Sequence, residues 1–216
     1  MMVDCGVTVS QLNKCLCNIP IFEENLMALK LAKTAGWQNF ILSDANHHYI
    51  DVILQHHDIN SSFIEIATNG SRVESTESSS SIGGVTVSGE MTRLRIYPHQ
   101  SIEAPHSCSL CPQNLCKGNV LDKWREEHSF SKVVYIGDGG GDFCPVVRLK
   151  AGDVALCRRN YTLHKMCIAA TSEVASDAVA GHRVEAHVVE WSNGQDILSC
   201  FRDVCKTVSD VDDSKL

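Results

Sequence analysis

Apolar residues at helical spacing predict a helix near the start of the chain. Between residues 21 and 35 they recur at every third or fourth position, as Phe22, Leu26, Leu29 and Ala32. Two acidic residues stand in the first turn, and Gly36 follows the last apolar position. Acidic first turns and a glycine just past the end are typical of helix termini. The pattern therefore predicts a helix over 21–35.

Short apolar runs alternate with further helical patterns along the rest of the chain. Strands are predicted at 39–42, 63–66, 132–136, 153–156 and 187–190, and helices at 46–55, 118–127, 143–149 and 194–205. Strands that alternate with helices favour a parallel sheet covered by helices on both faces. We therefore expect one three-layer α/β domain with a mostly parallel sheet over residues 1–206, followed by a polar tail over 207–216.

Two segments of the middle region interrupt this alternation. Residues 69–84 are rich in Ser, Glu and Gly and contain few apolar side chains, which predicts a flexible surface loop. Short apolar runs at 85–87 and 94–97 and a Cys-rich turn at 106–116 follow it. We expect residues 85–116 to form a small β- and Cys-rich insertion on the core.

Composition and charge narrow the classes of partner. Hydrophobic residues make up 44% and charged residues 21% of the 216, as in ordinary globular proteins. The net charge of -7 argues against binding to nucleic acid or to an anionic membrane surface. Neither an apolar run of about 18–20 residues nor an export signal is seen, so we expect no membrane partner and a cytoplasmic location. In that compartment most of the eleven Cys are expected to be reduced.

Polar side chains follow two of the predicted strands. Ser43 and Asp44 come directly after 39–42, and a glycine-rich turn with Asp138 and Asp142 comes after 132–136. Since ligands of open α/β sheets bind beyond the carboxyl ends of the strands, we expect the two groups to be neighbours. Two carboxylates on a glycine-rich turn suit a hard cation such as Mg²⁺. The alternative is that the two aspartates only shape the turn and cap the next helix.

Ser43 and Lys117 add groups that can bind phosphate. A serine at a strand end can donate a hydrogen bond to a phosphate oxygen, and a lysine at the start of the helix over 118–127 can offset phosphate charge. Taken singly, each residue type has an ordinary role, the serine as a helix cap and the lysine as a solvated charge. Their order along the chain is more informative than either residue alone.

The order Ser, then Lys-Gly, then Gly-Asp-Gly-x-x-Asp resembles motifs II, III and IV of the haloacid dehalogenase superfamily of phosphohydrolases. Longer segments narrow the resemblance: ILSDAN (41–46), RLRIYPH (93–99), HSCSLCPQNLCKG (106–118), VVYIGDGGGDFCPV (133–146) and GDVALCRRNYTLHK (152–165). They closely resemble the family of phosphoethanolamine/phosphocholine, pyridoxal-phosphate and plant pyrophosphate-type phosphatases. The resemblance implies a Rossmann-like core.

This resemblance also implies an activity and roles for individual residues. The family hydrolyses small phosphomonoesters or pyrophosphate with Mg²⁺, so a small phosphorylated metabolite would be the partner. Ser43, Asp44 and Lys117 would bind the substrate, with Lys117 bridging its phosphoryl group to the nucleophile. Asp138 would ligate Mg²⁺, and Asp142 would support the metal or Lys117. Lys117 and Asp142 would thus be the catalytic residues among these.

The chain departs from the family's pattern at the nucleophile. The family carries Asp-x-Asp-x-Thr on an apolar strand, followed by a cap, ahead of the helix matched by 21–35. Here Asp4 to Thr8 matches the spacing only in part, because Gly6 replaces the acid/base aspartate. We expect the core to be incomplete at its N-terminus. Gly141 also replaces the usual Asn of the metal loop.

Several interpretations follow from that departure. The chain could be a truncated gene product or alternative transcript of an active phosphatase. It could also be a catalytically inactive protein that still binds phosphate or metal, or a structural α/β domain with no ligand. The 216 residues do not decide among them.

A second group of residues has the spacing of metal ligands. His106, Cys108, Cys111 and Cys116 include one Cys-x₂-Cys pair, which suits weak tetrahedral binding of Zn²⁺. A single such pair is also typical of a packed turn of reduced thiols. The histidine pairs at 47–48 and 56–57 are expected to lie at the surface and have no assigned role.

Overall fold

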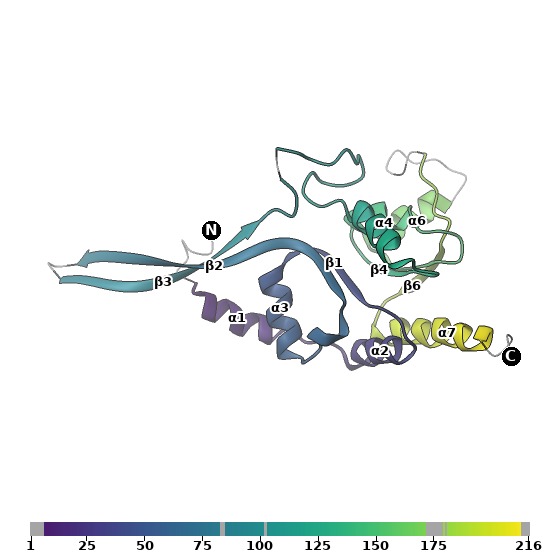
Figure 1. Cartoon of the computed structure of the whole chain (residues 1–216), viewed down its shortest axis with the longest axis horizontal. Coiled ribbons are helices and arrows are strands. Elements are labelled where there is room, and N and C mark those ends of the chain that lie inside the picture. The colour runs from purple at the N-terminus through teal and green to yellow at the C-terminus, as the bar shows by residue number, and fades with distance from the viewer. Residues whose placement is uncertain (1–6, 83–84, 102, 172–178, 180, 213–216) are drawn as a thin grey trace.

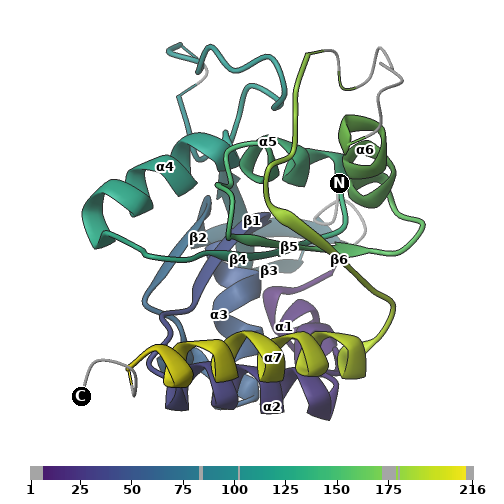
Figure 2. The same cartoon turned by 90° about the vertical axis from the view of Figure 1, so that its right-hand side faces the viewer.

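The computed structural model describes residues 7–82, 85–101, 103–171, 179 and 181–212. It is an α/β protein in three layers, as predicted (Figure 1). Figure 2 shows the strands between α4, α5 and α6 on one side and α1, α2, α3 and α7 on the other. The layered α/β class expected from the sequence is confirmed.

The N-terminal part supplies three helices and one strand. These are α1 (Val9–Cys17), α2 (Glu23–Thr34), β1 (Phe40–Asn46) and α3 (His47–His56), followed by the short 3₁₀ helix η2 (Asn60–Ser62). Gly36 follows α2 with φ +77, the left-handed conformation that glycine adopts without strain. Helix α1 was not predicted. It begins at a capping box, in which the Thr8 amide donates to Gln11 Oε1 and the Gln11 amide donates to Thr8 Oγ1.

A long antiparallel hairpin replaces the predicted loop over 69–84. Strand β2 (Glu65–Ile82) pairs with β3 (Val85–Tyr97) from Gly70 opposite Tyr97 to Ile82 opposite Val85, and the hairpin projects from the body (Figure 1). The prediction was wrong because it counted apolar side chains, whereas the two backbones satisfy each other's hydrogen bonds whatever their side chains. The first part of β2 also pairs in parallel with β1.

The C-terminal part forms an all-parallel sheet of three strands. Its strands are β4 (Val134–Gly137), β5 (Val154–Arg158) and β6 (His187–Trp191), with β5 in the centre. Its helices are α4 (Lys117–His128), η3 (Gly140–Asp142), α5 (Phe143–Val146), α6 (Thr162–Thr171) and α7 (Gly194–Asp212). Helix α6 was not predicted. Helix α5 is shorter than expected, and α7 continues into the predicted polar tail.

The core lies on both faces of β5, as the alternation of a strand requires. Ala155 and Cys157 pack on one face with Phe143 of α5. Val154 and Leu156 pack on the opposite face with residues of α2 and α7. Burial on both faces explains why this strand is apolar at every position from 154 to 157.

The strands form two sheets rather than the single sheet predicted. Among the described residues, β1 pairs only with β2, and β4 pairs only with β5. A cavity of about 250 Å³ lies between β1 and β4 and is lined by Phe40 and Leu42 from one strand and Val134 and Ile136 from the other. Both strands therefore turn an unpaired backbone edge toward a largely apolar space.

Candidate active site

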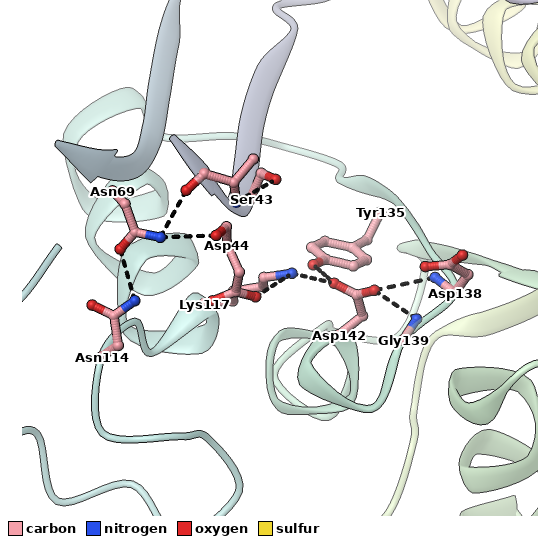
Figure 3. Close-up of polar contacts among 10 residues, drawn as sticks. Ser43, Asp44, Asn69, Asn114, Lys117, Tyr135, Asp138, Gly139 and Asp142 are labelled. Atoms are coloured by element: carbon pink, nitrogen blue, oxygen red, sulfur yellow. Dashed lines mark hydrogen bonds and ion pairs between the residues drawn. The ribbon is translucent and has the colours of Figure 1, made fainter. Parts of the chain in front are cut away.

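Lys117 lies at the centre of a charged cluster at the carboxyl ends of β1 and β4. As the first residue of α4 it is only 8% exposed, and its Nζ lies 2.9 Å from Asp142 Oδ1 and 3.2 Å from Asp44 Oδ2 (Figure 3). These contacts bring the end of β1 and the loop after β4 together, as the sequence predicted. An ammonium group has three protons, so a third donor remains to reach a ligand.

Asp142 is held by four donors. Its Oδ1 accepts from Lys117 Nζ at 2.9 Å and from the Tyr135 hydroxyl at 2.8 Å, while its Oδ2 accepts from the amides of Asp138 and Gly139 at 3.1 and 3.0 Å. The side chain folds back against Gly137, where an added Cβ would come within 2.8 Å of the Asp142 carboxyl group. Asp142 thus ties the loop, the strand and α4 into one unit.

The buried ion pair shifts the titration of its members. Burial lowers the pKa of Lys117, but the hydrogen bond and negative charge of Asp142, with that of Asp44, raise it more, and the net shift is upward. For Asp142, burial raises the pKa, but Lys117 and Tyr135 lower it more, and the net shift is downward. Burial, followed by the charge of Asp142, raises the pKa of Tyr135 well above its usual value. The pair is therefore ionised at neutral pH, and Tyr135 is protonated.

The end of β1 is shaped by Asn69 of β2. The Asn69 side-chain amide donates to the carbonyls of Asp44 and Ala45 at 2.8 and 2.7 Å, and its oxygen accepts from Asn114 Nδ2 at 2.7 Å. Ser43 Oγ accepts from the Ala45 amide at 3.2 Å, so its hydroxyl proton can still be donated. Figure 3 shows these groups beside Asp44 and Lys117.

Asp138 lies at the outer end of the same loop. Its carboxylate is about half exposed and lies 3.6 Å from Arg158 Nη1. Arg158 stacks over the ring of Tyr161, with 4.1 Å from its Cζ to the ring centroid. An exposed carboxylate at a sheet mouth is free to ligate a cation, whereas Asp142 has both oxygens engaged.

Most of the predicted site residues are joined directly. Lys117, Asp44 and Asp142 form one ion-pair cluster, and Ser43 and Asp138 flank it on β1 and on the loop. Residues that sequence reasoning missed are those that hold the cluster in place: Tyr135, Asn69, Asn114 and Arg158. Only the polar hydroxyl of Tyr135 inside an otherwise apolar run could have signalled such a role.

Asp4 and Gly6 of the partial nucleophile motif lie outside the described residues. Thr8 of that motif caps α1. Of the four histidines expected at the surface, His48 and His57 are partly buried: His48 Nε2 lies 2.6 Å from Asn13 Oδ1, and His57 Nε2 lies 3.1 Å from the Ile19 carbonyl. These contacts give both histidines a packing role.

Cys144 joins the cysteines that were predicted to bind Zn²⁺. The Sγ atoms of Cys108, Cys111, Cys116 and Cys144 all lie within 4.8 Å of one another. His106, which the sequence placed in this set, instead contacts the Pro112 carbonyl through Nε2 at 2.8 Å. Its Nδ1 accepts from the Cys108 amide at 3.3 Å.

The fold and the charged cluster define an α/β protein with a polar site at the carboxyl ends of its strands. None of the helices in the described part of the chain is long and apolar enough to cross a membrane. The sequence matches the family described as Putative Phosphatase over residues 1–205, and the chain belongs to this family.

Three relatives illustrate the range of that family. The chain is 34% identical to a thiamine phosphate phosphatase-like protein of Arabidopsis thaliana, over 97% of this chain and 77% of that protein. It is 30% identical to inorganic pyrophosphatase 2 of the same plant, over 95% and 66%. It is also 30% identical to a pyridoxal phosphate phosphatase of Mus musculus, over 91% and 73%. The chain thus spans about two thirds to three quarters of these relatives. No solved structure matches it significantly.

Proposed function

We propose that the charged cluster binds the phosphoryl group of a small phosphorylated metabolite or of pyrophosphate together with Mg²⁺, as part of a phosphatase active site. The observation that carries this proposal is the position of Lys117, buried and paired with Asp142 and Asp44 at the mouth of the strands. Membership of a phosphatase family and the substrates that appear in the relatives' names support the same chemistry.

Each residue would act through a specific atom. Lys117 Nζ, with one donor left, would offset the charge of a phosphate oxygen, and the Ser43 hydroxyl would donate to a second oxygen. Asp142 would keep Lys117 charged and fixed in direction through their 2.9 Å contact. Because Lys117 is already held before a ligand arrives, little reorganisation is needed on binding.

The donor set also fits Mg²⁺. Asp138 and Asp44 both present half-exposed carboxylates, and Mg²⁺ prefers oxygen ligands with several waters retained. When bound, the ion would neutralise phosphate charge and polarise the phosphoryl oxygens. Asp142 would position Lys117 and the loop without ligating the ion, since four hydrogen bonds already occupy its oxygens.

A binding protein without turnover is the second candidate. In this proposal Asp138 and Asp44 serve Mg²⁺, and Asp142 has both oxygens occupied by hydrogen-bond donors, so no described carboxylate of the site is left to act as a nucleophile. The aspartyl-phosphate chemistry implied by the family needs a further aspartate in line with the leaving group. Binding of phosphate and Mg²⁺ would survive without one.

Calorimetry tests the proposed binding site. We expect phosphoethanolamine, phosphocholine, pyridoxal phosphate or pyrophosphate to bind in the presence of Mg²⁺, and Asp138→Asn to weaken Mg²⁺ binding about tenfold or more. Asp51→Asn, an exposed carboxylate on α3, is the matched control and should bind as the wild type does. Unchanged Mg²⁺ affinity in Asp138→Asn would remove Asp138 from the site. Tighter binding of a phosphopeptide or nucleic acid than of the whole panel would overturn the substrate class.

A further inference from the structure

Four cysteines from three parts of the fold meet beside the active site. Cys108 and Cys111 lie in the segment between β3 and α4, Cys116 is the N-cap of α4, and Cys144 lies in α5. Cys116 and Cys144 are buried, and the other two are partly exposed. Residues separated by up to 36 positions therefore bring their thiols to one point.

We propose that Cys108, Cys111, Cys116 and Cys144 bind one structural Zn²⁺ ion through their four sulfur atoms. All four Sγ atoms lie within 4.8 Å of one another. A tetrahedral ion with zinc–sulfur bonds of about 2.3 Å requires sulfur–sulfur distances of about 3.8 Å. The Cys116–Cys144 distance is 3.8 Å and the Cys108–Cys144 distance is 3.5 Å. Two of the six sulfur–sulfur distances thus lie within 0.3 Å of the value for a zinc tetrahedron, and the other four are at most 4.8 Å.

The surroundings of the sulfurs suit a negatively charged metal centre. Four thiolates on one Zn²⁺ carry about two net negative charges, which donors nearby must offset. The Asn119 amide donates to Cys116 Sγ at 3.4 Å, and Arg148 Nη2 lies 3.9 Å from the same sulfur. The N-terminus of α4, with the positive end of its dipole, begins directly after Cys116.

A metal would also explain how the segment before α4 is ordered. Between Tyr97 and Lys117 the described residues form no helix or strand. Such a segment has few backbone hydrogen bonds of its own and gains most from a crosslink to the core. Cys108 and Cys111 would supply that link from the segment, and Cys144 would anchor it to α5.

The same ion would hold the Lys117–Asp142 ion pair of the candidate active site in position. Cys116 directly precedes Lys117, and Cys144 follows Asp142 by two residues. Closely packed neighbours fix the geometry, since a Cβ added at Gly118 would come within 2.6 Å of Cys144 Sγ and 2.5 Å of Arg148 Nε. The Zn²⁺ would therefore be a positioning element for both ends of the Lys117–Asp142 ion pair, without touching a substrate.

Metal analysis of the full chain tests the site. After expression with zinc in the medium, inductively coupled plasma mass spectrometry should find about one zinc ion per chain. Titration of the thiols with a mercurial reagent should release this zinc. Cys144→Ser should lose the zinc. His106→Ala and Cys15→Ser, the latter an exposed cysteine on α1, are the matched controls and should keep it.

A second measurement uses the wild-type chain, so it tests the site even if the Cys144→Ser variant fails to fold. Cobalt exchanged into the wild-type chain should give the intense visible and near-ultraviolet absorption of a tetrahedral tetrathiolate site. Protein that carries neither zinc nor cobalt would overturn the proposal, as would disulfides among these cysteines in freshly prepared protein. Loss of zinc in His106→Ala would overturn the four-sulfur ligand set, and bound iron in place of zinc would overturn the choice of metal.

Discussion

The Lys117 ammonium lies 2.9 Å from Asp142 Oδ1 and joins the first residue of α4 to the loop after β4. Both side chains are about nine-tenths buried, so water cannot hydrate the remaining charge if its partner is removed. The pair is therefore both the organising element of the candidate site and a point on which folding depends.

We expect Asp142→Asn to lower the free energy of unfolding by about 3–5 kcal/mol, because it leaves the Lys117 charge buried and short of a partner. Denaturant unfolding followed by circular dichroism measures the change. Glu127→Gln is the control, since Glu127 is half exposed and its 3.6 Å pair with Lys123 is worth at most about 0.5 kcal/mol. Equal effects of the two variants would contradict a special role for the buried pair.

The pKa shifts of this ion pair predict how the free energy of unfolding depends on pH. The pKa of Asp142 is lowered in the folded state, so its contribution is complete above the ordinary aspartate pKa of about 3.9 and is lost as the pH falls through the lower folded value. The pKa of Lys117 is raised, so its contribution is complete below about 10.4 and is lost as the pH rises through the folded value. We expect a constant difference in unfolding free energy between wild type and Asp142→Asn near neutral pH. This difference should shrink below about pH 4, and one that stayed constant into strong acid would argue against the ion pair.

Gly137→Ala should disrupt the loop, whereas Gly139→Ala should be tolerated. A Cβ at position 137 would lie 2.8 Å from the Asp142 carboxyl group, but one at position 139 would lie 3.6 Å from Asp142 Oδ2, an ordinary contact. We expect Gly137→Ala to weaken Mg²⁺ and phosphate binding at least tenfold and to destabilise the fold by about 1–3 kcal/mol. Calorimetry and thermal melts compare the two variants, and equal behaviour would mean that the loop has room to shift.

Periodicity predicted the elements that bury a continuous apolar face. The runs that became β1, β4, β5 and β6 and the helical patterns of α2, α3, α4 and α7 were located to within a few residues, apart from the C-terminal extension of α7. The apolar runs at 63–66, 85–87 and 94–97 fall at the start of β2 and within β3, but the strand over 69–82 was missed because this serine-rich segment has no apolar alternation. Helix α1 was missed because its signal is a capping box, which consists of two polar residues.

The polar cluster was predictable because it follows strand ends. Ser43, Asp44, Asp138 and Asp142 were placed at one edge of the sheet by topology alone, and the contacts of Lys117 with Asp44 and Asp142 join that edge. The supporting residues were missed, because Asn69 carries no motif and the hydroxyl of Tyr135, the one available signal, stands inside an apolar run. Cys144 was not included in the predicted zinc set because it is distant in sequence from the Cys-x₂-Cys pair.

The edges of β1 and β4 that pair with no described strand predict a tendency to aggregate. Ile136 is 41% exposed on β4 and lines the cavity between the sheets. Unpaired apolar strand edges template intermolecular pairing, and a charged side chain at such an edge blocks it. We expect Ile136→Lys to slow the rise of light scattering on warming. Ile168→Lys, at a 52% exposed site on α6, is the control and should have little effect. If both lysines acted alike, general charge rather than the strand edge would be the cause.

Removal of the proposed zinc should weaken both the fold and the site. Loss of about 3 kcal/mol of metal-dependent stability would lower the melting temperature by about 6–12 °C for a chain of this size. We expect a high-affinity zinc chelator to cause this drop and to weaken phosphate binding, because Cys116 and Cys144 flank Lys117 and Asp142. Zinc added back should restore both. The Cys144→Ser variant is the control for effects of the chelator itself, and it should not respond.

Finally, we expect the 216-residue chain to bind small phosphates with Mg²⁺ without hydrolysing them. Transfer of the phosphoryl group needs an aspartate in line with the leaving oxygen, whereas the described carboxylates of the site have other proposed roles, Asp44 and Asp138 as ligands of Mg²⁺ and Asp142 as the partner of Lys117. Asp4, the one residue that matches the family's nucleophile, has Gly6 where an acid/base aspartate would stand. Loss of general acid/base catalysis alone costs about 10²–10⁴-fold in rate.

Release of phosphate from the four-compound panel, with and without Mg²⁺, checks this expectation in the wild type and in Asp4→Asn. Phosphate release should stay at the uncatalysed rate in both proteins, while calorimetry shows that both still bind the same phosphates with similar affinity. Binding without turnover would show that phosphoryl transfer is lost while substrate binding is kept, because Lys117 and Asp138 would still act as binding groups. Mg²⁺-dependent turnover by the wild type that disappears in Asp4→Asn would contradict the prediction and identify Asp4 as the nucleophile. Turnover that survives in Asp4→Asn would instead require Asp44 or Asp138 to leave its ion pair and attack, which Asp44→Asn and Asp138→Asn would then distinguish.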